Sequence, residues 1–218
     1  MVTREEVIAA VNEQRIIVIA RGFAIEELIP AAEAMYAGGI RLMEVTYDAK
    51  GNPSDEEIAE RIGVLARHFA GRMYIGAGTV LTAKQVELTH RAGGQFIISP
   101  DSSEEVIRKT RELGMVSIPG AFTATEATTA CRYGADFIKI FPNSEVKPSY
   151  IKALTVPLSH IPFLAVGGVT PENAAEYMAA GAAGIGVASG ILDKKLVRAG
   201  DYAGITEKAR RYVSIVKG

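Results

Sequence analysis

The sequence predicts an α/β protein, a TIM (β/α)8 barrel with an extra N-terminal helix, as a single domain over residues 1–218. Three observations predict this fold. Short β-branched runs alternate with longer amphipathic segments along the whole chain, which is typical of parallel strands joined by helices. Eight such pairs can be counted, and 218 residues suit one barrel domain. No linker or low-complexity tract interrupts the alternation.

The elements can be placed in order along the chain. The extra helix is expected at about Arg4–Glu13, before the first strand. The eight strands are expected at Ile16–Ala20, Leu42–Thr46, Met73–Gly76, Phe96–Ser99, Val116–Ile118, Phe137–Phe141, Phe163–Val166 and Gly184–Val187. Helices should begin near Thr82, Ser103 and Thr170, and glycines such as Gly134 mark where helices stop. A doubly wound open sheet is the alternative, but no Gly-x-Gly-x-x-Gly pattern follows the first strand.

Composition excludes several classes of function. Lys and Arg number 24 against 25 Asp and Glu, so the net charge of −1 gives no sign of a nucleic-acid partner. The one cysteine, Cys131, permits neither an internal disulfide nor a cysteine-rich metal site. The three histidines, His68, His90 and His160, share no metal-ligand spacing, so no metal is expected. The chain shows no signal-peptide segment and no membrane-spanning apolar stretch, which predicts a cytoplasmic protein with no membrane partner.

Two charged residues stand inside apolar strands. In a TIM barrel the active site forms at the C-terminal ends of the strands. Burial lowers the pKa of a lysine amine such as Lys139 and frees it to attack a carbonyl, although a lysine that snorkels into water is the alternative. Glu44 is costly to bury unless it is functional or forms a structural salt bridge. Together the two suit Schiff-base chemistry, with Lys139 as nucleophile and Glu44 moving protons.

Small and polar residues mark the other strand ends. The Gly167-Gly168 pair and Ser189-Gly190 predict an anion site for phosphate, a carboxylate or another anion. Gly76-Ala77-Gly78-Thr79 predicts close backbone approach to a small substrate, with an ordinary turn as the alternative. Arg21 ends the first strand, and Pro100 follows the fourth.

Five runs resemble those of the 2-keto-3-deoxy-6-phosphogluconate aldolases, lysine-dependent class I enzymes also described as 4-hydroxy-2-oxoglutarate aldolases. They are Gly76–Leu81, Ile98–Pro100, Ile118–Gly120, Phe137–Pro142 and Ala165–Val169, and the resemblance covers essentially the whole chain. It implies a lyase of carbohydrate metabolism, a homotrimeric barrel that needs no metal or other cofactor. It further implies cleavage of a phosphorylated 2-keto-3-deoxy sugar acid to pyruvate and glyceraldehyde 3-phosphate. Cleavage of 4-hydroxy-2-oxoglutarate to pyruvate and glyoxylate is a second candidate activity.

The resemblance also implies roles for individual residues. Lys139 would be the Schiff-base lysine and Glu44 the general acid and base. The substrate carboxylate and pyruvate end would lie at Arg21, Thr79 and Pro100, and the phosphate at Gly167, Gly168 and Ser189.

Some runs, such as Ile19–Gly22 and Pro148–Leu154, resemble the 6-phosphogalactonate-type members more closely. Gluconate-type members carry an arginine four residues after the glutamate, where this chain has Asp48. An aspartate would repel a carboxylate, so Arg21 takes over that role or the acceptor end of the substrate differs. Asp48 is therefore expected to mark a specificity loop, and both substrate types stay open.

Two other functions suit the same residues. A sugar-phosphate isomerase or epimerase would use the barrel and anion site for enolisation without an imine. A non-catalytic protein that binds a sugar-acid phosphate would need only the binding site.

Overall fold

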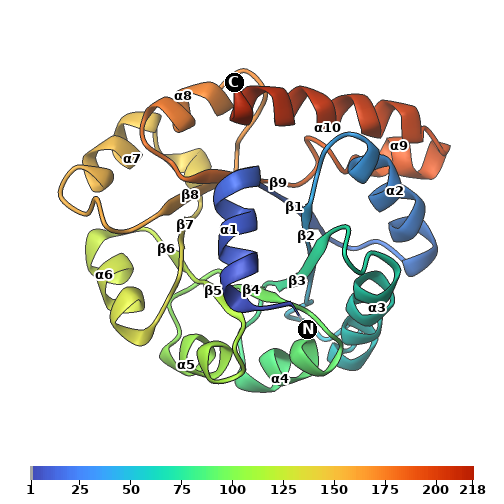
Figure 1. The fold of residues 1–218 in the computed structure, drawn as a ribbon, viewed down its shortest axis with the longest axis horizontal. Helices are drawn as coiled ribbons and strands as arrows, with labels where there is room; N and C mark the ends of the chain where they lie inside the picture. The colour runs from blue at the N-terminus through green and yellow to red at the C-terminus, as the bar shows by residue number, and fades with distance from the viewer. Residues whose placement is uncertain (1) are drawn as a thin grey trace.

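The computed structural model describes residues 2–218, which form a parallel barrel inside a ring of helices (Figure 1). All strand pairs are parallel, and the order is β5-β4-β3-β2-β1-β9-β8-β7-β6. The strands are β1 Ile16–Ala20, β2 Leu42–Thr46, β3 Tyr74–Gly78, β4 Phe96–Ile98, β5 Val116–Ile118, β6 Gly120–Ala121, β7 Ile138–Ile140, β8 Phe163–Val166 and β9 Gly184–Val187.

The barrel closes through β5 and β6, which are two pieces of one strand. Only Pro119 separates them, and a proline has no N–H to donate to a sheet ladder. Its carbonyl still accepts the Lys139 N–H at 2.9 Å, and the Ser117 carbonyl accepts the Asp136 N–H at 2.9 Å. The nine strands therefore occupy eight positions, and the predicted (β/α)8 barrel is confirmed.

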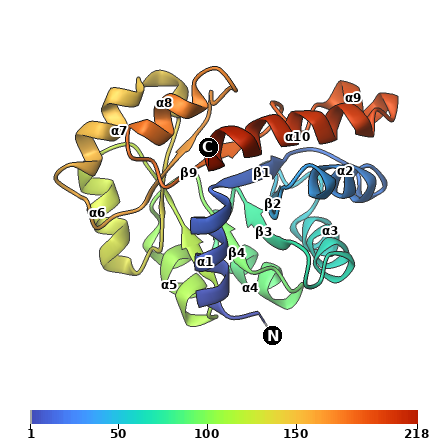
Figure 2. The same ribbon diagram turned by 45° about the horizontal axis from the view of Figure 1, so that its top comes forward.

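Helices follow the strands and surround the barrel (Figure 2). They are α1 Arg4–Gln14, α2 Ile25–Ala37, α3 Asp55–His68, α4 Ala83–Arg91, α5 Glu104–Glu112, α6 Ala124–Tyr133, η1 Asn143–Glu145, α7 Pro148–Thr155, α8 Ala174–Ala179, α9 Lys194–Ala199 and α10 Tyr202–Lys217. Ser54 and Thr123 begin α3 and α6 with capping boxes, and Gly134 ends α6 in a left-handed conformation. Among the described residues, no helix is both long and apolar enough to span a lipid bilayer.

The strand predictions differ from the structure at β3, at β4, which ends at Ile98 instead of Ser99, and at β7, which covers Ile138–Ile140 instead of Phe137–Phe141. β1, β2, β5, β8 and β9 have the predicted bounds. β3 runs to Gly78 instead of Gly76, because its glycines continue the pairing with β2 as far as Thr46. The helix expected near Thr170 begins later, at Ala174, because a turn across residues 170–173 precedes it.

The extra helix α1 closes one end of the barrel. It lies across the barrel opening in Figure 1, and its Val7, Ala10 and Val11 pack against side chains from the barrel interior. Those interior residues include Leu42 and Phe137, from near the start of their strands. Full burial of one such side chain contributes about 1.5–3 kcal/mol. The opposite, C-terminal end of the strands is left open.

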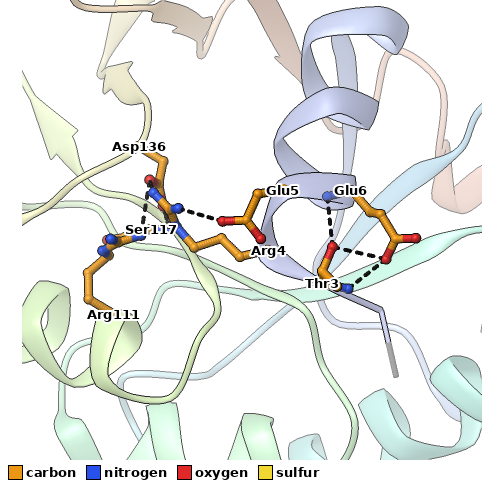
Figure 3. A network of polar contacts seen from close by, with 7 residues as sticks. All are labelled: Thr3, Arg4, Glu5, Glu6, Arg111, Ser117 and Asp136. Atoms are coloured by element: carbon orange, nitrogen blue, oxygen red, sulfur yellow. Dashed lines mark hydrogen bonds and ion pairs between the residues drawn. The ribbon is translucent and has the colours of Figure 1, made fainter.

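A polar network joins α1 to the same end of the barrel (Figure 3). Asp136, just before β7, accepts a hydrogen bond from the Ser117 N–H at 2.9 Å and forms an ion pair with Arg4. The Arg111 guanidinium lies 3.5 Å from the same carboxylate. Thr3 begins α1 with a capping box, in which its Oγ1 accepts the Glu6 N–H at 3.2 Å.

Candidate active site

A cavity of about 910 Å³ opens at the C-terminal ends of the strands. Parallel strands in a barrel end on one rim, so residues distant in sequence converge there. The cavity is lined by eight of the nine predicted site residues, which are Arg21, Glu44, Thr79, Pro100, Lys139, Gly167, Gly168 and Ser189. Asp48 is the exception.

Lys139 lies at the centre of β7, paired in register with Gly120 and Leu164. It is only 7% exposed, so it does not extend into bulk water as a snorkelling lysine would. Its Nζ lies 4.5 Å from the centre of the Phe141 ring. Burial lowers the pKa of Lys139, the Glu44 charge acts to raise it, and the Arg21 charge lowers it further. A lowered pKa leaves more of the neutral, nucleophilic amine at neutral pH.

Glu44 lies at the centre of β2, in register with Ile19 of β1 and Gly76 of β3. It is 2% exposed, and its Oε2 has no hydrogen-bond partner among the described residues. The structural salt bridge considered from the sequence therefore does not satisfy this oxygen. Burial raises the pKa of Glu44 to about 7, although the Lys139 and Arg21 charges act to lower it. A carboxyl group with this pKa can both give and take a proton at neutral pH.

The glycines of β3 make room for Glu44 and for the core. A Cβ on Gly78 would lie 2.4 Å from Glu44 Oε1, and one on Gly76 would lie 2.4 Å from the Phe96 ring. The sequence suggested that this run lets a substrate approach the backbone. Glu44 and Phe96 occupy the space that a Cβ on these glycines would need, and approach of a substrate to this backbone stays a prediction.

Arg21 and Thr79 lie together at the mouth of the cavity. Arg21 Nη2 donates a hydrogen bond to Thr79 Oγ1 at 3.0 Å. Thr79 has a backbone φ of 57°, which is uncommon for a threonine and places it in a tight turn directly after β3. The guanidinium is exposed and has further N–H donors, so it can accept a carboxylate in a charge-assisted contact.

The predicted anion site is built from tight glycine turns. Gly167 and Gly168 have φ values of 96° and 72°, which glycine adopts readily. A Cβ on Gly168 would lie 2.8 Å from Ser144, so this loop packs closely against η1. Asn173 holds the loop by donating from Nδ2 to the Gly168 carbonyl at 3.0 Å and accepting the Thr170 N–H at 2.8 Å. Ser189 lies exposed on the neighbouring turn after β9.

Asp48 does not reach the cavity lining. Its Oδ1 accepts the Lys50 N–H at 2.7 Å, and its carbonyl accepts the Gly51 N–H at 3.0 Å. These bonds fold the chain into a local turn directly after β2. The structure thus separates Asp48 from the other predicted residues, and its role in specificity stays a prediction.

Several lining residues were not anticipated from the sequence. Phe141 follows β7 and is partly exposed in the cavity, where the strand-end rule could have found it. Helix α10 contributes Lys208, Arg211 and Tyr212. Because α9 lies between the last strand and α10, these residues are far from any strand end, and the strand-end rule could not find them. Within residues 2–218, no group of three or more His, Cys, Asp or Glu side chains is placed to hold a metal ion.

Comparison with known proteins identifies the family of this chain. The family model described as KDPG and KHG aldolase matches residues 7–208. The 2-dehydro-3-deoxy-6-phosphogalactonate aldolase of Escherichia coli (strain K12) is 41% identical over 175 residues, which are 80% of this chain and 82% of that protein.

Two solved structures share the fold with a TM-score of 0.83. One is the KDPG aldolase of Legionella pneumophila with pyruvate captured as a covalent carbinolamine, 26% identical over 96% of this chain and 97% of that one. The other is a cage designed by fusing symmetric oligomeric domains, 36% identical over 93% of this chain and 72% of that one. This chain belongs to the KDPG and KHG aldolase family.

Proposed function

We propose that this protein is a class I aldolase, a carbon–carbon lyase that works through a Schiff base on Lys139. One observation carries the proposal. A buried lysine with a lowered pKa shares a cavity with a buried, incompletely partnered glutamate whose pKa is about 7. The family membership supports it, as does the covalent pyruvate carbinolamine of the Legionella relative.

The proposed reaction begins at the ketone of the substrate. The Lys139 amine attacks C2, and the resulting carbinolamine loses water to form an iminium ion. In its protonated form Glu44 donates the proton that the departing hydroxide needs, and the carboxylate is left behind. A pKa near 7 suits this exchange, because both forms of Glu44 are then present at neutral pH.

Bond cleavage then uses the iminium as an electron sink. The Glu44 carboxylate removes the proton of the C4 hydroxyl as the C3–C4 bond breaks and an aldehyde leaves. The electron pair of that bond moves toward C2 and gives an enamine. Protonation at C3 and hydrolysis release pyruvate and restore the Lys139 amine.

We assign the ends of the substrate by charge. The carboxylate of C1 would lie at Arg21 and Thr79, near Pro100, and the phosphate at Gly167, Gly168 and Ser189. The substrate class is then a 2-keto-3-deoxy-6-phospho sugar acid, and the aldehyde product is glyceraldehyde 3-phosphate. The 41% identity to a galactonate-type aldolase favours that stereochemistry over the gluconate type.

The domain organisation, the oligomeric state and the cellular location belong to the same proposal. We infer one catalytic domain over residues 1–218, since the family match spans residues 7–208. We further infer a cytoplasmic homotrimer; the designed cage of fused symmetric oligomeric domains supports self-association. Light scattering of the purified protein tests the trimer, and a monomeric mass would contradict it.

A pyruvate-release panel tests the proposed function. The substrates are 2-keto-3-deoxy acids derived from gluconate, galactonate and uronates, each with and without phosphate, and lactate dehydrogenase reports pyruvate. We expect release from a 6-phosphorylated acid, with 4-hydroxy-2-oxoglutarate as a slower substrate. Interconversion without pyruvate would indicate an isomerase or epimerase, and saturable binding without turnover would indicate a binding protein.

A further inference from the structure

Two cationic side chains from the C-terminal helix line the outer part of the cavity. Lys208 and Arg211 are three residues apart on α10, so they lie on the same face of this helix. They line the same cavity as Lys139 and the glycines of the anion site. The Schiff-base mechanism uses neither of them.

The position of α10 beside the anion site is fixed by specific contacts. Tyr212 Oη donates a hydrogen bond to the carbonyl of Val169, at 3.3 Å, in the loop that carries the anion site. A Cβ on Gly190 would lie 2.4 Å from the same hydroxyl, so the turn after β9 packs directly against α10. Thr206 Oγ1 donates to the Ala34 carbonyl of α2 at 2.9 Å. The helix therefore holds its two cations at a defined place on the cavity wall.

Each cation forms an ion pair with a carboxylate that a ligand can replace. Arg211 Nη2 lies 2.9 Å from Glu172 Oε1, and these side chains are 61% and 69% exposed. Lys208 Nζ lies 3.3 Å from Asp193 Oδ2. Exposed ion pairs stabilise a protein very little, so a ligand of higher charge can replace the carboxylate. The Arg211 guanidinium also has donors beyond the one that Glu172 engages.

We propose that Lys208 and Arg211 are specificity-determining residues, which bind the phosphate dianion at the far end of the substrate and select against unphosphorylated acids. This inference rests on the proposed function, because it assigns the end of the substrate most distant from the ketone. The glycine turns offer backbone donors without charge, whereas the two cations add charge-assisted hydrogen bonds. Glu172 forms an ion pair with Arg211 when no substrate is bound, and the phosphate replaces Glu172 when the substrate binds.

Calorimetric titration with glycerol 3-phosphate, and with glycerol for comparison, tests this inference without catalysis. The proteins are the wild type, Lys208→Ala, Arg211→Ala and the matched control Arg210→Ala. Arg210 is the neighbour of Arg211 on the same helix, does not line the cavity and lies 3.9 Å from Glu207. Glu172→Gln is measured as well, and the unfolding temperatures of all five proteins show whether each is folded.

We expect Lys208→Ala and Arg211→Ala each to raise the Kd of glycerol 3-phosphate about tenfold, the effect of losing one charge-assisted hydrogen bond. Arg210→Ala should bind like the wild type, and glycerol should bind weakly to all. Glu172→Gln should tighten glycerol 3-phosphate binding, because Arg211 is then free. Wild-type Kd values in both cavity variants, or no binding to the wild type, would overturn the inference.

Failure of this inference and failure of the proposed function give different results. Without Schiff-base chemistry, the wild type releases no pyruvate, yet the loss of binding in the two variants would still establish the phosphate contacts. If the function holds and the inference fails, pyruvate is released and the two variants keep wild-type KM values for phosphorylated substrates. If both hold, the variants raise KM for phosphorylated acids and leave KM for unphosphorylated acids unchanged.

Discussion

The barrel buries one carboxylate near each end, and the two differ in how many hydrogen-bond and ion-pair partners they have. Asp136, at the end covered by α1, is 5% exposed and has Arg4, Arg111 and the Ser117 N–H as partners (Figure 3). Glu44, at the open end, is 2% exposed and its Oε2 has no partner among the described residues. Burial raises the pKa of both groups.

This difference in partners indicates a stabilising role for Asp136 and a chemical role for Glu44. A buried carboxylate with several partners fastens elements together, and Asp136 joins α1 to the strands in this way. A buried carboxylate with an unsatisfied oxygen lowers the stability of the folded protein, and the unpaired oxygen is free to exchange a proton. TIM barrels place stabilising contacts at the N-terminal end of the strands and catalytic residues at the C-terminal end.

Lys139→Met should have the largest effect. It removes the proposed nucleophile, so pyruvate release should fall by at least about 10⁴-fold. It also removes a buried ammonium, so the unfolding temperature should stay the same or rise. Steady-state assays and thermal unfolding measure the two effects. Substantial remaining activity would show that Lys139 is not the nucleophile.

Glu44→Gln should lower kcat by about 10²–10⁴-fold, the usual contribution of a general acid or base. The substituted amide keeps the shape of the side chain but cannot exchange the proton. Normal kcat with an intact fold would assign the proton transfers to another group.

The same variant should change how stability depends on pH. The folded-state pKa of Glu44 is raised from 4.5 to about 7, so the folded protein holds a proton that the unfolded chain releases between these values. Stability from this group is therefore present below pH 4.5 and lost as pH rises to about 7, where the loss amounts to about 3 kcal/mol. Glu44→Gln should be more stable than the wild type at pH 8, with a smaller difference at pH 5. A variant less stable at pH 8 would contradict this.

Asp136→Ala, at the other end of the barrel, should lower stability and leave activity unchanged. It leaves the Ser117 N–H and two arginines without their shared acceptor, which should cost about 2 kcal/mol of stability. Denaturant unfolding measures this loss. The kcat and KM values at 25 °C should match the wild type, and a drop in kcat in the folded variant would break the separation between the two ends.

Asp48→Asn should have the smallest effect. Asp48 lies in a local turn outside the cavity lining, and an asparagine can accept the same hydrogen bond from Lys50. Stability should change by less than about 0.5 kcal/mol, and KM values across the substrate panel should be unchanged. A shift in substrate preference would restore the specificity role predicted from the sequence.

The contrast between the ends also explains what the sequence could predict. Charges inside apolar strands are visible in sequence, so Lys139 and Glu44 could be found, and the strand-end rule located Arg21 and Thr79. The partners of Asp136 depend on how α1 crosses the barrel, which no local pattern encodes. Lys208 and Arg211 reach the cavity only through the packing of α10 against α2 and against the loop that contains Val169.

Borohydride trapping in the presence of pyruvate tests the central claim most directly. The account predicts that mass spectrometry of the digested wild type finds one reduced pyruvate adduct, on the peptide that contains Lys139. Lys139→Met should give no adduct, and Asp136→Ala should give the wild-type adduct. An adduct on another lysine, or none in the folded wild type, would contradict the account.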